Sequence, residues 1–287
     1  MTWAKLLAGI DGGSGSEAVV TAAVQLGQAF AARVELLHVE VSEEEAIPMV
    51  AEGMTAGAVG KMLESLAEQR QVRAETAEKL YRTLCVDAGL PTCEPDAAPV
   101  PGRFRIAFRR VAGRESDEIA RRGRLADLVI VPKPIAEAAF SQAVETAIFA
   151  TGRPLLMVPE TLPERPGSSI AIAWDGTLGS ARATGAALPL LGRAETVTVL
   201  TADMEKVGAK PSALVDYLAE HGISARTWAF LPGEGVLGER LLAEAKEAGA
   251  NMLVMGAYGH SRLREMVLGG VTQSVTAKSE IPVFMAH

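Results

Sequence analysis

The feature that most constrains the fold of this chain is an internal repeat. An apolar run ending in Asp-Gly occurs at 6–12 (LLAGIDG) and again at 170–176 (IAIAWDG). A Gly-Ser pair follows each run, at 15–16 and at 179–180, and opens an Ala-rich stretch of helical character. Serine in this position predicts a helix N-cap, so Ser16 and Ser180 are expected to cap two equivalent helices. The chain is therefore predicted to contain two copies of one folding unit.

Two further pairs of apolar runs extend the repeat. ADLVIV at 126–131 corresponds to ANMLVM at 250–255, and RPLLMVP at 153–159 corresponds to IPVFMA at 281–286. The remaining β-like runs are at 33–39, 104–111, 194–200 and 223–230. Buried strands that alternate with helices are typical of a parallel sheet covered on both faces. Each half is thus predicted to be an α/β domain, an open and doubly wound parallel-sheet sandwich.

The two predicted domains span 1–159 and 169–287, and a polar, Pro/Gly-rich segment at 160–168 links them. The first domain carries an insert at about 42–101 with a helical stretch at about 57–88. The last strand of each half is apolar, and apolar sheet edges tend to be paired or covered. We therefore expect the halves to pair within the chain as a pseudo-twofold unit, with further homodimerisation left open.

Composition excludes several classes of function. The net charge of −7 and the pI of about 5.3 disfavour nucleic-acid binding, because such a surface repels phosphate backbones. The arginines at 121, 122 and 124 fall at an expected helix end, where cations suit the helix dipole. No apolar run reaches the roughly 18 residues of a membrane span. The spacing of Cys85 and Cys93 matches no zinc or redox motif, which favours two reduced thiols and a cytoplasmic location.

The segment after the run at 250–255 contains the glycine pattern from which a binding site is predicted. Residues 256–275 read GAYGHSRLREMVLGGVTQSV, with glycines at 256, 259, 269 and 270. Glycines at the carboxyl end of a parallel strand let backbone N–H groups approach an anion, and a helix expected at about 271–279 adds its N-terminal dipole. Thr272 lies in the first turn of that helix and can add a hydroxyl. The pattern predicts a phosphate-binding loop.

Ligands of open α/β sheets bind in the crevice at the carboxyl ends of the strands. Asp175 ends the first apolar run of the second half, so it is expected to face this crevice and to hydrogen-bond a ribose hydroxyl. Alternatively, Asp175 caps its own turn, which is the favoured interpretation for Asp11 in the first half. Trp174 could stack on a base, although a buried tryptophan is the commoner case.

The spacing G-x2-G-x9-G, formed here by Gly256, Gly259 and Gly269, resembles the nucleotide loop of the universal stress protein family. The resemblance covers nearly all of 169–287 and, more weakly, 5–159, as in the tandem two-domain members. It implies the five-stranded α/β sandwich shared with adenine nucleotide alpha hydrolase-like proteins. It also implies a role in stress adaptation, with ATP or AMP bound in many members, Mg²⁺ as an accompanying ion, and no common catalytic residue.

Under this resemblance, Asp175 would contact the ribose or adenine side, and Thr201 would offer backbone groups to the adenine. The phosphates would be held by the loop and the first turn of the next helix, at Gly256, Gly259, Gly269, Gly270, Val271 and Thr272. One position departs from the family pattern. ATP-binding members usually have Ser or Thr directly after the third glycine, where this chain has Gly270. The hydroxyl donor is lost there, although the backbone N–H remains.

The first half departs further from the pattern. Val131-Pro132-Lys133-Pro134-Ile135 stands where the glycines belong, and the segment after it is four residues shorter than in the second half. Proline removes an N–H donor and fixes φ. The first half is therefore predicted to bind no nucleotide in the manner of the family.

Other side chains near the loop add no second site. His260 has no second ligand within reach in the sequence, so no metal site is expected. Arg262 and Arg264 could screen phosphate charge or form a solvated loop face. Neither a Ser/His/Asp nor a Cys/His set is suggested by spacing, so no catalytic residue is assigned.

Three classes of function remain open. The first is a regulatory module that binds an adenine nucleotide in its second half and acts on an unknown protein partner. The second is a nucleotide-free structural or interaction scaffold of the same fold, favoured by Gly270 and by the degenerate first half. The third is an enzyme of this nucleotide fold, for which the expected upper limit is slow ATP hydrolysis, because the sequence lacks the additional signatures of pyrophosphatases and adenylyl transferases.

Overall fold

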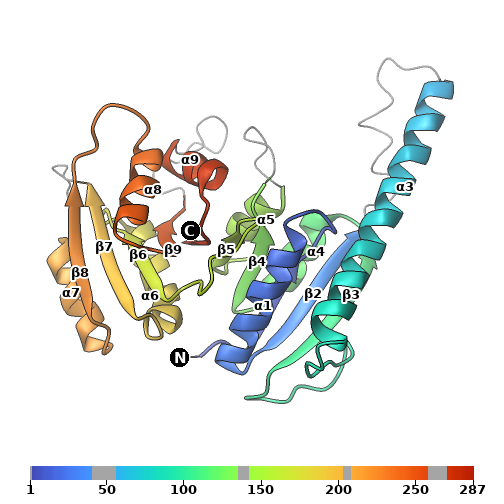
Figure 1. The fold of residues 1–287 in the computed structure, drawn as a ribbon, viewed down its shortest axis with the longest axis horizontal. Coiled ribbons are helices and arrows are strands. Elements are labelled where there is room, and N and C mark those ends of the chain that lie inside the picture. The colour runs from blue at the N-terminus through green and yellow to red at the C-terminus, as the bar shows by residue number, and fades with distance from the viewer. Residues whose placement is uncertain (1, 41–55, 135–141, 203–207, 258–269) are drawn as a thin grey trace.

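The computed structural model describes residues 2–40, 56–134, 142–202, 208–257 and 270–287. One sheet of ten strands passes through both halves of the chain, in the order β3-β2-β1-β4-β5-β10-β9-β6-β7-β8 (Figure 1). The strands within each half are parallel to their neighbours, whereas β5 and β10 pair antiparallel. The predicted α/β class with open, doubly wound parallel sheets is confirmed.

The described elements of the first half begin near the N-terminus and end at the β5 strand. They are β1 (Lys5–Gly9), α1 (Ser16–Phe30), β2 (Arg33–Glu40), α3 (Ala56–Tyr81), a π-helical turn (Arg82–Val86), β3 (Arg105–Ala112), α4 (Glu115–Gly123), β4 (Leu128–Pro132), α5 (Gln142–Ala150) and β5 (Leu155–Val158). The predicted helical stretch of the insert corresponds to α3 and the π-helical turn.

The second half repeats this order without the long insert helix. Its described elements are β6 (Ser169–Ala173), α6 (Leu178–Leu191), β7 (Thr196–Ala202), α7 (Pro211–Glu220), β8 (Ala225–Phe230), α8 (Leu237–Glu247), β9 (Met252–Gly256), α9 (Gly270–Lys278) and β10 (Val283–Ala286). Every apolar run identified as a strand from the sequence overlaps one of the ten strands. No helix in the described ranges is both long and apolar enough to cross a membrane.

The prediction that Ser16 and Ser180 are N-caps is wrong. The N-cap of α1 is Gly15 and that of α6 is Thr177, and neither makes a side-chain capping bond. The Ser16 hydroxyl instead bonds Asp11 Oδ1 at 3.0 Å, across the turn that follows β1. Both helices begin earlier than the Gly-Ser pattern indicates, because the Asp-Gly turns already direct the chain into the first helical turn.

In each half, one side-chain oxygen fixes the start of the first strand by accepting hydrogen bonds from its backbone. Asp127 Oδ2 accepts the backbone N–H groups of Ala4 and Lys5 at 2.7 and 3.0 Å. In the second half, Asn251 Oδ1 accepts the N–H of Ser169 at 3.1 Å. The repeat therefore conserves a function of the side chain, since carboxylate and amide oxygens both accept backbone N–H groups.

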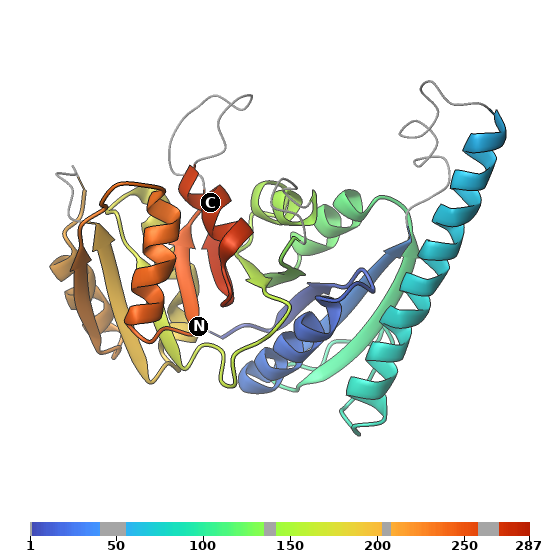
Figure 2. The ribbon, with the colours of Figure 1, turned by 45° about the horizontal axis from the view of Figure 1, so that its top comes forward.

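Helices cover both faces of the sheet. Buried residues of α1, α3, α6 and α7 pack on one face, in a cluster that includes Ala77 and Leu214. Buried residues of α4, α5, α8 and α9 pack on the other face, in a cluster that includes Ile119 and Val275. Figure 2 shows α3 running along the outer strands β2 and β3 of the first half and extending beyond them.

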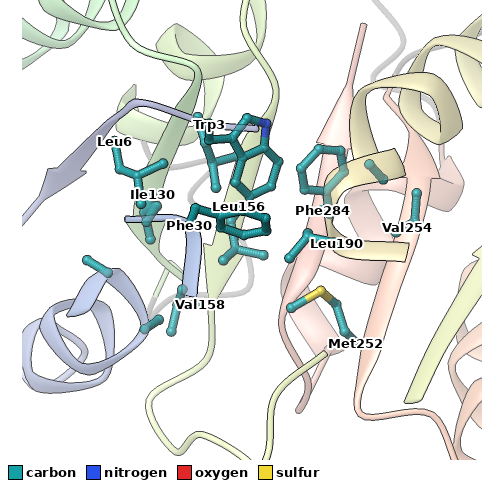
Figure 3. Close-up of a cluster of buried hydrophobic side chains, with 14 of the residues drawn as sticks. Trp3, Leu6, Phe30, Ile130, Leu156, Val158, Leu190, Met252, Val254 and Phe284 are labelled. Carbon is teal, nitrogen blue, oxygen red and sulfur yellow. The ribbon is translucent and has the colours of Figure 1, made fainter. Parts of the chain in front are cut away.

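The two halves share a core where β5 meets β10. Phe284 of β10 is opposite Leu156 of β5 in the antiparallel register. Trp3 stacks on Phe284 with 6.1 Å between ring centroids, and it also contacts Phe30 of α1 at 4.8 Å (Figure 3). Phe284 is fully buried, and Trp3 is 6% exposed. The apolar terminal strands thus cover each other's edges, and we refer to this contact as the seam.

A buried carboxylate lies beneath α4 on the first half of the sheet. Glu35 of β2 is 2% exposed. Its Oε1 accepts hydrogen bonds from Arg109 of β3 at 2.9 Å and from Arg122 of α4 at 3.0 Å. The predicted position of arginines at the end of this helix is confirmed, and Arg122 is in addition part of a buried ion network.

Candidate functional site

Sheet topology brings the described candidate residues of the second half to one edge. Strands β9, β6 and β7 are parallel neighbours, so their carboxyl ends lie side by side. Gly256 is the last residue of β9, Asp175 lies just after β6, and Thr201 lies at the end of β7. The helix α9 begins at Gly270. Gly259 and Gly269 lie outside the described residues, as do His260, Arg262 and Arg264.

Asp175 holds a tight turn after β6. Its Oδ1 accepts the backbone N–H of Thr177 at 3.0 Å and the Thr177 hydroxyl at 2.7 Å. Gly176 within this turn has φ +73°, and a Cβ there would lie 2.7 Å from the backbone nitrogen of Ala209. The turn therefore seats the segment before α7 directly against the end of β6, and one Asp175 carboxylate oxygen is engaged in the turn.

Gly256 allows β9 to meet the start of α6. A Cβ at Gly256 would lie 2.6 Å from the carbonyl carbon of Gly179 and 2.8 Å from the nitrogen of Ser180. Any larger residue would therefore push the first turn of α6 away from the sheet. The sequence predicts Gly256 only as a position where an anion can approach the backbone, and it does not indicate this packing role.

The first turn of α9 contains the three remaining candidate residues. Among the described residues, and leaving out its chain neighbours and the backbone of α9, no heavy atom lies within 4 Å of the position that a Cβ would take at Gly270. Val271 is half-buried, and Thr272 is 4% exposed. Because the Thr272 side chain lies in the core, the donors that this turn can offer to an anion are foremost its backbone N–H groups.

Trp174 is part of the scaffold of the crevice. It is 8% exposed, and its Nε1 donates a hydrogen bond to the carbonyl oxygen of Ala209 at 2.8 Å. The buried alternative favoured for this residue is confirmed. The Trp174 bond and the Gly176 turn both fix the segment that precedes α7.

In the first half, the insert helix α3 lies against the equivalent turn. Asp11 Oδ1 accepts the N–H of Gly13 at 2.8 Å, which confirms its predicted role in the turn. Asp11 Oδ2 also pairs with Arg73 Nη1 of α3 at 3.3 Å. A Cβ at Gly12, whose φ is +74°, would lie 2.1 Å from the Arg73 carbonyl oxygen. The Asp11 side of this crevice is therefore closed by α3, a contact that no sequence pattern indicated.

A third charged group belongs to this closed turn. Burial raises the pKa of Glu115, the first residue of α4, above its ordinary value. The Asp11 carboxylate raises it further, and the Arg73 guanidinium opposes the rise. The Arg73 cation of α3 therefore pairs with Asp11 and also acts electrostatically on Glu115.

The end of β4 differs from the end of β9 as the sequence predicts. Pro132 closes β4 at the position that Gly256 has in β9, and a Cβ at Gly15 would lie 3.0 Å from the Pro132 Cβ. The Lys133 N–H donates to the Val158 carbonyl oxygen at 2.7 Å and so extends the pairing with β5. Ile135 lies outside the described residues. The described backbone here continues the sheet.

The remaining titratable candidates have structural positions. Cys85 and Cys93 are free thiols, and burial raises the pKa of Cys85 to about 11. The His38 ring is 3% exposed, and its Nδ1 lies 2.9 Å from the Ile10 carbonyl oxygen. Within the part of the chain that the structure describes, no three His, Cys, Asp or Glu residues are grouped to hold a metal ion.

Comparison with known proteins supports the sequence resemblance. The model of the universal stress protein family matches residues 171–287. A universal stress protein of Bacillus subtilis, YxiE, is 36% identical over 69 residues, which are 24% of this chain and 45% of that protein. Universal stress protein Slr1230 of Synechocystis is 25% identical over 168 residues, which are 55% of this chain and 56% of that protein. The matched regions thus span about half the length of these relatives.

Solved structures extend the likeness of fold to the whole chain. A universal stress protein from Archaeoglobus fulgidus superposes with a TM-score of 0.66 at 15% identity, covering 98% of this chain and 97% of its own. A putative universal stress protein from Pseudomonas aeruginosa has a TM-score of 0.57 at 15% identity, covering 99% and 93%. Together, these findings show that the chain contains a universal stress protein domain at residues 171–287 and that the whole chain has the fold of these two solved structures.

Proposed function

We propose that this chain is a regulatory module of the universal stress type with one adenine-nucleotide site per chain, located in its second half. The supporting observation is the position of α9, which begins at Gly270, directly after the third glycine of the G-x2-G-x9-G pattern. The carboxyl ends of β9 and β6 are adjacent to each other. In this proposal, Asp175 and Thr201 contact the nucleoside, and the segment from Gly256 to Thr272 holds the phosphates.

The structure of the first half supports the proposal of a single nucleotide site per chain, because its equivalent crevice differs from that of the second half. Its turn after β1 is covered by Arg73, and β4 ends in Pro132. A proline offers no N–H donor for a phosphate. Bound ATP or AMP, with Mg²⁺ where required, would then bias the surface of one half toward a protein partner. A cytoplasmic location and further dimerisation are part of the same proposal.

Calorimetric titration of the full chain with ATP and Mg²⁺ tests this proposal. One binding site per chain is expected, and Gly259→Val should abolish it, because a branched side chain obstructs the approach of an anion to the backbone. Gly185→Val is the matched control, since Gly185 is exposed in α6 and has open space around it. Two sites per chain, or full binding by Gly259→Val, would contradict the proposal.

A nucleotide-free scaffold of the same fold is the second candidate. It is favoured by the glycine at position 270, which provides no hydroxyl for a phosphate. Absence of nucleotide in protein purified from cells, combined with no thermal shift by ATP, would support this alternative. Hydrolysis in the first candidate is expected to be slow at most, and multiple turnover at tens per second would point to an enzyme instead.

A further inference from the structure

A cavity of about 590 Å³ lies beside the seam. It is next to Lys133 and Pro134, which follow β4 at the place where the second half has its glycine-rich segment. Its walls come from four places: the turn before α1, the end of β4, the segment 159–163 after β5, and the end of α9 with the residues that follow it. It is therefore built by both halves. Its volume is in the range of about 300–1,000 Å³ that is usual for small-molecule sites.

Lys133 supplies the positive charge of the cavity wall. It follows β4, and its Nζ donates a hydrogen bond to the Ser279 carbonyl oxygen at 2.9 Å. The lysine thus extends from the first half to the second. The fixed position of the Nζ atom places an ammonium group at the seam, in the wall of the cavity.

Negative and neutral groups form the rest of the wall. Glu160 and Glu280 are both exposed; Glu160 begins the linker between the halves, and Glu280 lies between α9 and β10 of the second half. Hydroxyl groups come from Ser14 and Thr161, and prolines with Leu162 provide apolar surface. Among the described residues, one ammonium and two carboxylates therefore line this cavity.

This set of charges selects the class of ligand. The two glutamates repel a multiply charged anion, and Lys133 opposes a positive group at its own end of the cavity while it attracts a negative one. A molecule that carries one negative and one positive group satisfies both ends. The nucleoside side of the first crevice is closed by Arg73 against Asp11, so the available space suits a ligand without a base and ribose.

We infer that this seam cavity binds a small organic zwitterion of the amino-acid type. The anionic group of the ligand lies toward Lys133, and its cationic group lies toward Glu160 and Glu280. The ligand contacts both halves and therefore stabilises their relative position, because binding to the folded state alone adds to its stability. This site is separate from the nucleotide site proposed for the second half.

Three probes with the same number of carbon atoms separate the contributions of charge. 4-Aminobutanoate carries both charges, butanoate only the negative one, and butylammonium only the positive one. Titrations followed by amide chemical shifts of the full chain should show saturable binding of 4-aminobutanoate. Its affinity should exceed that of either singly charged probe by about tenfold, the effect of one charged hydrogen bond.

Variants of the chain test the two ends of the cavity. Lys133→Met should weaken 4-aminobutanoate about tenfold, and Lys133→Arg should preserve its binding. The double variant Glu160→Gln with Glu280→Gln should weaken it to a similar extent while leaving butanoate unaffected or bound more tightly. Glu164→Gln, an exposed linker residue outside the cavity wall, is the matched control and should bind as the parent chain does.

Several outcomes would overturn the inference. Butanoate binding as tightly as 4-aminobutanoate would identify a plain anion site. Equal affinity in Lys133→Met, or no saturable shifts with 4-aminobutanoate, would exclude the assigned site. ATP binding measured on the Lys133→Met variant keeps the two sites distinct, because it should equal that of the parent chain whether or not the zwitterion binds.

Discussion

Arg73 Nη1 lies 3.3 Å from Asp11 Oδ2, so the insert helix of the first half pairs with the carboxylate of the turn after β1. The corresponding turn of the second half, at Asp175, adjoins Gly208 and Ala209, which precede α7. The turn after the first strand therefore has different neighbours in the two copies of the fold. In the first half a long helix covers it, and in the second half it adjoins the proposed nucleotide crevice.

The contact between Gly12 and α3 gives a first prediction. Gly12→Ala should lower the free energy of unfolding by about 3 kcal/mol, because its Cβ would overlap the Arg73 carbonyl and φ is positive. Gly89→Ala is the control, since Gly89 has φ +69° but open space around it, and it should cost about 1 kcal/mol. Urea unfolding measures both. Equal effects of the two substitutions would show that α3 does not press on Gly12.

Position 270 gives a second prediction, about binding. Gly270→Ser should strengthen ATP binding about tenfold, because the hydroxyl restores a donor beside the first turn of α9, where a Cβ is clear of the described side chains. Gly185→Ser, at an exposed and open position of α6, controls for the change of residue type. Unchanged or weaker ATP binding by Gly270→Ser in calorimetry would argue against phosphate at this helix start.

Glu118 gives a prediction about pH. Hydrogen bonds from Arg121 at 2.6 Å and Arg122 at 2.8 Å lower the pKa of Glu118 below its ordinary value. A carboxyl whose folded pKa is lowered stabilises the fold above its unfolded pKa of about 4.3, and this stabilisation is lost as the pH falls through the folded pKa. Glu118→Gln should therefore destabilise by about 1 kcal/mol at neutral pH and progressively less at acidic pH.

Urea unfolding of the parent chain and of Glu118→Gln across this pH range is the measurement. Glu164→Gln in the exposed linker serves as the control and should change stability by less than about 0.5 kcal/mol. A difference between parent and Glu118→Gln that stays constant with pH would refute the role assigned to these two arginines.

The seam gives a prediction about the coupling of the halves. Phe284→Ala should destabilise the chain by about 3–5 kcal/mol, because Phe284 is fully buried between Leu156 and Trp3. Phe149→Ala is the matched control, since Phe149 is 46% exposed, and should cost about 1 kcal/mol or less. Comparable losses in thermal or urea unfolding would mean that the seam contributes little to the fold.

Much of the fold follows from local patterns in the sequence. The paired apolar runs locate all ten strands, because a strand buried on both faces requires continuous apolar residues. Helix starts were less accurate: Ser16 and Ser180 were expected to be caps, yet Gly15 and Thr177 are. The competing signal was the Asp-Gly turn, which uses side-chain oxygens before the helix begins.

Contacts between distant segments could not be read from the sequence. Glu35 in RVELLHV has the pattern of an ordinary strand, and only the fold places Arg109 and Arg122 around it. Arg73 is 62 residues from Asp11 and belongs to no motif. Of the candidate site, the sequence located Asp175, Thr201, Gly256 and the start of α9 at one sheet edge, but it did not predict that Gly256 packs against α6.

A crystal structure of the full chain grown with saturating ATP and Mg²⁺ tests the proposed function most directly. Density for one adenine nucleotide is expected in the second half, with its phosphates beside the N–H groups of Gly270 and Val271. The turn at Asp11 should hold none, because Arg73 occupies that side. An empty crevice in the second half under these conditions, or a nucleotide bound at Asp11, would contradict the proposal.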